Sequence, residues 1–331
     1  MRWFRGSGRG PRRRLRRREQ RGQPRRSAGR SLVCAKVPPE SVDPVSLLGA
    51  SRVTIVAGKG GVGKTTVTAV LARTAAAAGR RVLAVELDGK PVLGQLVGDL
   101  PCEQISAPQA LEDYLREHGF GRVAKRLSSS GVIDVVATAA PGIDDIVVLG
   151  KIKALERSGE WDVIVVDGPA AGHAITFLTS AAGLQDAVRG GPVRAQADDV
   201  MELLHDPERS QVVLVTLPET TPVNEVVETA YALEDRVGVR LGAVVVNNVD
   251  GPAGGGRVPD PDTADLAGVA EAELLRQAAA FRRSRRRMQD DEIARLSAEL
   301  ALEQWHLPQL AAAGLGRADI VELADALRRA P

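Results

Sequence analysis

The sequence predicts an α/β domain with a doubly wound, mostly parallel sheet and helices on both faces. Short runs rich in β-branched residues alternate with helical stretches, and each run is apolar throughout rather than at every second position. Strands of a parallel sheet are covered on both faces and therefore lose that alternation. A glycine-rich loop also joins the first run to a helix-forming stretch. The predicted strands are Val53–Ala57, Val82–Leu87, Ile133–Ala137, Asp162–Val166, Val212–Leu217 and Ala243–Val246.

Residues 1–48 precede the first strand and are predicted to form an arginine-rich, disordered tail. The first 30 residues contain 13 Arg and a single acid, Glu19, although the whole chain has a net charge of only +2. Such a segment has too little apolar surface to offset the entropy lost on ordering. It could bind nucleic acid or an anionic membrane, or it could be a solvated tail or the product of a start codon assigned too far upstream.

Residues 49–331 are predicted to form one domain with helical insertions at about 100–158 and 251–300. The second insertion opens with the turn-rich GPAGGGRVPDPDT and continues as a long, highly charged helical pattern. Within it, the basic run Phe281–Arg287 is followed by acids, so ion pairs between residues i and i+4 are expected. This pattern favours a solvated helix face over a nucleic-acid patch.

Several classes of protein are excluded by what the sequence lacks. The basic N-terminal run is not followed by the apolar stretch of an export signal, and no run approaches the length of a membrane-spanning helix. Cys34 and Cys102 are the two cysteines and form no CxxC pair, so a cysteine-rich zinc site or an iron–sulfur cluster within one subunit is not expected. The chain is predicted to be cytoplasmic.

The loop GKGGVGKTT, residues 58–66, predicts a nucleotide phosphate site. It has the spacing GxxxxGK[ST] and lies between a strand and a helical run. The glycines let backbone amides close on phosphate oxygens, and the helix N-terminus adds partial positive charge. Lys64 is predicted to bridge the β- and γ-phosphates as a catalytic residue, and the Thr65 hydroxyl to help hold Mg²⁺. The loop residues predicted to bind are Gly58, Gly60, Gly61, Val62, Gly63, Lys64, Thr65 and Thr66.

Acids follow two of the predicted strands, at the sheet edge where the phosphates must lie. Asp88 ends the second strand and is predicted to orient the attacking water, with a plain Asp-Gly turn as the alternative. Asp167 follows the strand at Asp162–Val166, as in a Walker B motif, and is predicted to lie near Mg²⁺ through a water. Gly172 is placed to offer its amide to the γ-phosphate, whereas His173 is as well explained by a helix start as by catalysis.

Lys59, just after the first glycine, is not needed by a general phosphate loop. A lysine in this position marks the deviant Walker A group, and further motifs narrow the resemblance. These are the strand-end Asp88, the loop Asp167–His173, APGIDDIVVLGKI at 140–152, HDPERSQVVLVTLPE at 205–219, Val246-Asn247, RRRMQ at 285–289 and WHLPQL at 305–310. With them the chain resembles the ArsA-type ATPases, which include anion pumps and tail-anchored-protein targeting ATPases, over nearly all of Arg52–Arg329.

The resemblance implies a Mg²⁺-dependent ATPase that works as a homodimer or as a heterodimer with a homologous ATPase. Lys59 would reach phosphates in the opposite subunit and neutralise charge that develops during hydrolysis. Asn247 would read the adenine, with Pro218 and Glu219 near the nucleotide, which implies ATP rather than GTP. A solvated loop lysine and a strand-end turn residue are the simpler interpretations of Lys59 and Asn247.

Departures from the family pattern limit what carries over. The family's DPAH is DGKP here, at 88–91, and the proline of DxxPxGH comes one place early, at Pro169, so both switch loops could move differently. The clustered cysteines that bind metalloid are absent, so arsenite pumping is not expected. The zinc-binding CxxC pair of the targeting ATPases is also missing, because Arg282, Arg283 and Ser284 stand before RRRMQ. Any dimer must therefore form without zinc.

The leading hypothesis is a cytoplasmic, dimeric ATPase whose ATP-bound closed state handles a protein or membrane client, with peripheral membrane association as one option. One alternative is a slow nucleotide switch that times assembly with a homologous partner subunit. Another is a partition or division-site ATPase that binds DNA or membrane, although nucleic-acid binding is expected only through the basic tail.

Overall fold

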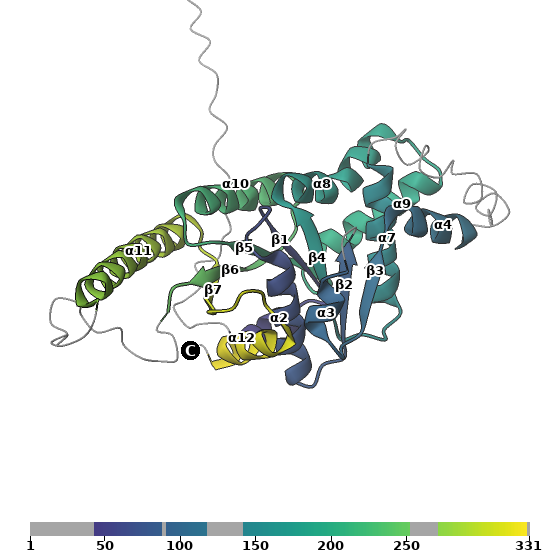
Figure 1. The fold of residues 1–331 in the computed structure, drawn as a ribbon. Coiled ribbons are helices and arrows are strands. Elements are labelled where there is room, and N and C mark those ends of the chain that lie inside the picture. The colour runs from purple at the N-terminus through teal and green to yellow at the C-terminus, as the bar shows by residue number, and fades with distance from the viewer. Residues whose placement is uncertain (1–42, 88–90, 118–141, 252–270, 330–331) are drawn as a thin grey trace, which may run out of the picture. The chain divides into compact units, whose positions relative to one another are not determined.

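A seven-stranded sheet forms the centre of the described structure, and every neighbouring pair of strands is parallel (Figure 1). The computed structural model describes residues 43–87, 91–117, 142–251 and 271–329. The order β3-β2-β4-β1-β5-β6-β7 puts β1 in the middle, so the chain winds outward in both directions. This confirms the predicted doubly wound α/β fold. The strands are β1 (Val53–Gly58), β2 (Val82–Leu87), β3 (Cys102–Ile105), β4 (Val163–Ala170), β5 (Ser210–Thr216), β6 (Leu241–Val249) and β7 (Glu303–Pro308).

Helices cover both faces of this sheet (Figure 1). One face carries α1, α2, α3 and α12, and the other carries α4, α7, α8, α9 and α10. The long helix α11 packs against α10. Their bounds are α1 (Pro44–Gly49), α2 (Lys64–Ala77), α3 (Leu93–Val97), α4 (Ala107–Glu117), α7 (Ile143–Arg157), α8 (Ala171–Ala187), α9 (Pro192–His205), α10 (Thr220–Arg236), α11 (Ala272–Glu299) and α12 (Arg317–Arg329).

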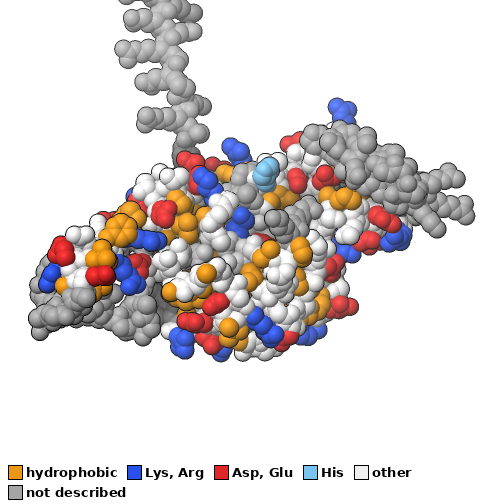
Figure 2. Space-filling model, viewed as in Figure 1, with side chains coloured by type: hydrophobic (Ala, Val, Ile, Leu, Met, Phe, Trp, Pro, Cys, Tyr) orange, Lys and Arg blue, Asp and Glu red, His pale blue; other side chains and the backbone are white. Residues whose placement is uncertain are grey.

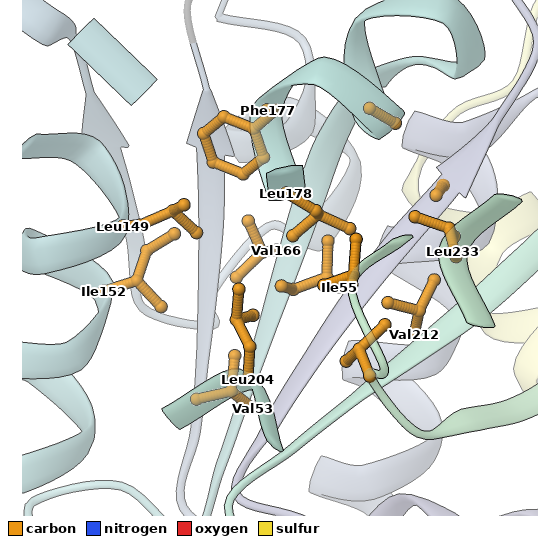
Figure 3. Close-up of a cluster of buried hydrophobic side chains, with 14 of the residues drawn as sticks. Val53, Ile55, Leu149, Ile152, Val166, Phe177, Leu178, Leu204, Val212 and Leu233 are labelled. Carbon is orange, nitrogen blue, oxygen red and sulfur yellow. The ribbon is translucent and has the colours of Figure 1, made fainter. Parts of the chain in front are cut away.

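The strands are apolar throughout because both of their faces are buried. Figure 3 shows part of one core, where side chains of β1, β4 and β5 meet those of α7, α8, α9 and α10. All of the labelled side chains are at most 5% exposed. Each side chain of this size contributes about 1.5–3 kcal/mol on burial. The sheet is therefore a fixed platform on which the loops at the strand ends are held.

The structure corrects two of the predicted boundaries. Helix α1, with Leu47 and Leu48 buried, lies partly inside the stretch 1–48 that was predicted to be a disordered tail, so the folded domain begins before residue 49. The first insertion is not wholly helical, because it supplies the edge strand β3. The predicted strand Ile133–Ala137 and residues 1–42 lie outside the described residues.

The C-terminal helix α12 docks on α2, the helix that follows the glycine loop. Its Ile320, Leu323 and Leu327 are buried in the same core as the α2 residues. Within residues 43–87, 91–117, 142–251 and 271–329, none of the helices combines the length and apolar character that a bilayer crossing requires.

Candidate active site

The glycine loop lies at the carboxyl end of the central strand β1 and leads directly into α2. Gly61 and Gly63 have φ angles of 87° and 90°, a left-handed conformation that residues with a Cβ rarely adopt. At Gly63 an added Cβ would also stand 2.3 Å from the Nδ2 atom of Asn247. The first backbone N–H groups of α2 have no hydrogen-bond partner within the helix, so they are available to a ligand held by the glycine loop. This arrangement suits a bound phosphate.

Thr65 and Asp167 are brought together beside the loop. The Thr65 hydroxyl donates a hydrogen bond of 2.6 Å to Oδ2 of Asp167, and Thr68 donates a longer one of 3.4 Å to Oδ1. The parallel pairing of β1 with β4, which sets Val56 opposite Asp167, fixes this position. Burial raises the pKa of Asp167 above its usual value, while the Thr65 hydrogen bond and nearby Lys64 act in the opposite direction. A buried carboxylate of this kind would be stabilised by a cation.

The oxygen atoms of Thr65 and Asp167 suit Mg²⁺, which prefers oxygen ligands, better than a metal that prefers sulfur or nitrogen ligands. Thr65 and Asp167 supply a hydroxyl and a carboxylate oxygen, and Mg²⁺ is commonly bound by one or two such groups together with waters and substrate phosphates. In the described ranges no group of three or more His, Cys, Asp or Glu side chains is placed to hold a metal ion by itself. A Mg²⁺ ion held by these two groups would take its remaining ligands from waters and substrate phosphates.

The two lysines of the loop differ in their surroundings. Lys64 is partly buried, and this burial lowers the pKa of its ammonium group, although nearby Asp167 acts to raise it. Its Nζ donates a hydrogen bond of 3.2 Å to the carbonyl oxygen of Lys59. Lys59 points elsewhere, because its ammonium group forms an ion pair with Glu225 on α10. Within this one subunit, therefore, Lys59 is not directed into its own loop.

A buried glutamate links the end of β2 to the residues that begin α3. Glu86 accepts hydrogen bonds from the backbone N–H groups of Val92, at 3.1 Å, and Leu93, at 3.2 Å. It is 5% exposed, and its carboxylate ties the end of β2 to the start of α3. Asp88, predicted to orient water, falls between these anchors but lies outside the described residues.

The remaining predicted nucleotide residues lie at the same edge of the sheet. Asn247, near the end of β6, donates from Nδ2 to the carbonyl oxygen of Val62 at 2.9 Å, so it contacts the glycine loop directly. Pro218 and Glu219 follow β5 and lead into α10. Gly172 lies in the first turn of α8, immediately after β4. The structure thus brings residues at the carboxyl ends of β1, β4, β5 and β6 to one edge of the sheet.

A cavity of about 380 Å³ adjoins the junction between β4 and α8. Pro169, His173 and Phe177 line one side, and Asp144 and Val148 of α7 line the other. His173 is exposed. Movement at the junction of β4 and α8 would reshape this cavity, because its walls include Pro169 of β4.

Three contributors to the site were missed by the sequence analysis. Glu86 was treated as a single polar residue in an apolar strand. A buried glutamate needs a hydrogen-bond or ion-pair partner, so its presence in that strand could have indicated a contact. Thr68 gave no signal, since it lies outside the loop motif. Glu225 gave none either, because it is 166 residues away from its partner Lys59.

The comparisons with known proteins agree with this geometry. The family model for anion-transporting ATPases, ArsA_ATPase, matches residues 51–189. The chain is similar to ATPase BagA of Mycobacterium tuberculosis (strain H37Rv), with 33% identity over 255 residues that cover 69% of this chain and 72% of that protein.

Two pump-driving ATPases are similar over a shorter stretch. The arsenical pump-driving ATPase of Escherichia coli is 33% identical over 197 residues, and that of Acidiphilium multivorum is 32% identical over 197 residues. In both cases the match covers 58% of this chain and 33% of the relative, so the chain corresponds to about a third of each pump. With a phosphate loop at the centre of a parallel sheet and relatives of this kind, the chain belongs to the ArsA-type family of ATPases.

Proposed function

We propose that the protein hydrolyses ATP to ADP and phosphate with Mg²⁺, and that the nucleotide drives closure of a dimer. The observation that carries this proposal is the Thr65–Asp167 hydrogen bond beside the glycine loop, because it holds a hydroxyl and a buried carboxylate where a phosphate-bound Mg²⁺ would lie. When bound, Mg²⁺ would neutralise charge on the β- and γ-phosphates. Lys64 and the first amides of α2 would bind those phosphates, and Asn247 would contact the adenine.

Hydrolysis also needs a positioned water and a response to the γ-phosphate. We assign the water to Asp88 on the strength of its place after β2, whose end Glu86 anchors. Gly172, in the first turn of α8, would donate its amide to the γ-phosphate. Loss of that phosphate would release the start of α8 and change the cavity beside Pro169.

Dimer closure would involve a change of partner for Lys59. In the single subunit its charge is neutralised by Glu225, whose second oxygen is buried without a hydrogen-bond partner in the described part of the chain. Both side chains of this pair are partly exposed, so breaking it costs under about 1 kcal/mol. The phosphates of a facing subunit would supply the compensating attraction. Closure would then depend on bound nucleotide, and a protein or membrane client would respond to it.

Mixing of inactive variants tests this proposal on the full-length chain. Phosphate release is measured with ATP and Mg²⁺, and we expect it to be lost with EDTA and weak with GTP. Lys59→Ala and Asp88→Asn are each expected to be inactive. If Lys59 acts across the interface, a mixed dimer has one complete site, and random mixing restores about a quarter of the wild-type activity.

Two outcomes would contradict parts of the proposal. If the mixture stays inactive while the two variants demonstrably exchange subunits, Lys59 acts within its own subunit. If Asp88→Asn keeps wild-type turnover, the water-orienting role is wrong. The rival function, a slow switch, predicts turnover that is low in the isolated chain and rises when a homologous partner subunit is added.

A further inference from the structure

Helix α11 contacts the end of β6, the strand that carries Asn247. Much of the surface of this helix is exposed, and Figure 2 shows charged side chains there with hydrophobic ones among them. The buried residues of α11 are Gln289 and Leu296, and Gln289 is only 1% exposed. A buried glutamine needs a hydrogen-bond partner. Its partner is Asp250, the residue directly after β6.

The backbone and the side chain of Asp250 are both bound by α11. Its N–H donates to Oε1 of Gln289 at 2.8 Å, and its carbonyl oxygen accepts from Nη1 of Arg286. Its carboxylate accepts from Arg282, with Nη2 to Oδ1 at 2.9 Å and Nε to Oδ1 at 3.1 Å. The same Nη2 reaches the carbonyl oxygen of Gly251 at 3.1 Å. The three helix residues are spaced by four and three and so lie on one side of α11, and we call them the α11 clamp.

A bulge in β6 lies between the clamped residue and Asn247. The pairing of β6 with β7 shifts register between Val246 and Val249, which places Asn247 and Asn248 in the bulge. Asn248 has a φ angle of 61°, a left-handed conformation that a residue with a side chain keeps only where its surroundings require it. A bulge of this kind changes the direction of a side chain beside a site. The path of the chain through it is therefore set by what holds its two ends.

The bulge directs the amide of Asn247 at the glycine loop. Nδ2 of Asn247 donates to the carbonyl oxygen of Val62 at 2.9 Å, and a Cβ added to Gly63 would stand only 2.3 Å from the same nitrogen. An asparagine amide has its donor at the nitrogen and its acceptor at the oxygen. Because the nitrogen faces the Val62 carbonyl, the acceptor Oδ1 is turned away from it. The amide is thus held in one of its two orientations.

This orientation is what would distinguish one base from another. Oδ1 can accept a hydrogen bond from the exocyclic amino group of adenine. Guanine and hypoxanthine carry a carbonyl oxygen at the same position, which cannot donate. An amide free to rotate could offer its nitrogen to that oxygen instead. Selection of adenine by Asn247 therefore requires that the amide stay fixed.

We propose that the α11 clamp fixes Asn247 for base recognition, and that Arg282 is a specificity-determining positioning residue of the ATPase. The inference rests on the proposed function, because it deepens the contact of Asn247 with adenine. Arg282 acts through Asp250, three residues beyond Asn247, by holding the chain where it leaves the bulge. The substrates favoured are nucleoside triphosphates whose base carries the amino group.

Phosphate release by the full-length chain with ATP and with inosine triphosphate tests the role of Arg282. Arg282→Met keeps the apolar stem and removes the guanidinium group. We expect the ratio of kcat/KM for ATP to that for inosine triphosphate to fall about tenfold, because the amide can then turn. The fall should come from a higher KM for ATP, with kcat changed less than about twofold. A wild-type ratio in folded Arg282→Met would overturn the proposal.

Two further variants guard against a loss that is merely structural. Arg276→Met is the matched control on the same helix, because the pair of Arg276 with Glu273, at 3.6 Å, is exposed, and we expect a wild-type ratio. Gln289→Leu frees the backbone of Asp250 without leaving a charge unpaired, so it decides the matter if Arg282→Met does not fold. Its ratio should fall about fivefold, and an unchanged ratio in this variant would also refute the clamp.

A double-mutant cycle with Asn247→Ala shows whether Arg282 acts through Asn247. We expect Arg282→Met to leave the ratio unchanged once Asn247→Ala is present, because the amide to be positioned is gone. A further fall would mean that the clamp acts by another route, and the proposal would be wrong. A wild-type ratio in Asn247→Ala alone would contradict the adenine contact of the proposed function, and with it the role of the clamp. A reduced ratio in Asn247→Ala beside an unchanged one in Arg282→Met would contradict the clamp alone.

Discussion

The two edges of the central sheet place charge in opposite ways. At the amino edge, residues that immediately precede the strands form matched ion pairs. Arg81 pairs with Asp162 at 2.6 Å before β2 and β4, and Arg209, before β5, pairs with the buried Glu156 at 2.7 Å. At the carboxyl edge, Lys64 and Asp167 are both partly buried. Their mutual attraction opposes the effect of this burial on their pKa values but does not cancel it.

The pKa directions separate the two edges. At the amino edge the ion pairs favour the charged forms, since Arg81 holds the pKa of Asp162 at about 2 and Glu156 raises that of Arg209. At the carboxyl edge burial disfavours the charged forms of both Lys64 and Asp167. The ion pairs at the amino edge therefore stabilise the fold. The partly buried charges at the carboxyl edge lower its stability but are placed to bind phosphate and metal. Substitutions at the two edges should differ accordingly.

Lys64→Met should give the largest effect and should reduce activity without reducing stability. Removal of the phosphate-bridging charge is expected to lower kcat/KM about 1,000-fold, or about 4 kcal/mol. The methionine keeps the apolar stem and removes a charge that burial disfavours, so Tm should not fall. Phosphate release and thermal unfolding measure the two effects. A large fall in Tm would mean that the carboxyl edge is stabilised by its charges.

Arg209→Ala should do the reverse at the amino edge. Glu156 is 5% exposed and would keep only the more distant Arg52, at 3.8 Å, so we expect a loss of about 3 kcal/mol in the free energy of unfolding. Urea unfolding measures it, and kcat per folded molecule should be unchanged. Arg157→Ala is the control, because its pairs with Asp199 and Glu202 are exposed and worth under about 1 kcal/mol.

Asp167→Asn should separate function from stability at a single position. Turnover is expected to fall about 100-fold, or about 2.7 kcal/mol, with weaker dependence on Mg²⁺. The folded-state pKa of Asp167 is raised, so its carboxylate disfavours folding once the pH rises through that value, and the neutral amide does not. Tm at pH 7 should therefore increase, and the increase should shrink at acidic pH. A lower Tm at neutral pH would contradict this reasoning.

Asp162→Asn should give the smallest effect, and one with the opposite pH dependence. The folded-state pKa of Asp162 is lowered to about 2, so its contribution is present above the usual pKa of an aspartate and is lost as the pH falls through 2. Because the pair with Arg81 is exposed, the difference in Tm between wild type and variant should be small at pH 7 and should disappear once the pH is well below 2. A difference that grows on acidification would exclude this pair as its source.

The sequence predicted the glycine loop and the main strands well because both depend on local patterns. The strand Val82–Leu87 matches β2 at both ends, and the loop at 58–66 lies where its motif requires. Strand β3 was missed because its four residues, Cys102 to Ile105, include Glu and Gln and bury only Ile105. Helix α1 was missed because it spans only six residues, Pro44–Gly49, and falls at the end of the stretch that was assigned to the tail.

Contacts between distant parts of the chain were beyond the reach of local patterns. The contact of Asn247 with the carbonyl oxygen of Val62 and the ion pair of Lys59 with Glu225 depend on the order of strands in the sheet. The helix at α11 was expected from its charged pattern, and the ion pair between Arg286 and Asp290 confirms the predicted i to i+4 pairing.

The docking of α12 on α2 also affects how the enzyme is made. Ribosomes produce the glycine loop early and α12 late, after every strand of the sheet. Until α12 emerges, the apolar side of α2 that receives Ile320, Leu323 and Leu327 stays open to solvent or to a chaperone. The nascent chain would thus hold an almost complete phosphate loop on an unsupported helix, and nucleotide affinity would mature only once α12 has emerged.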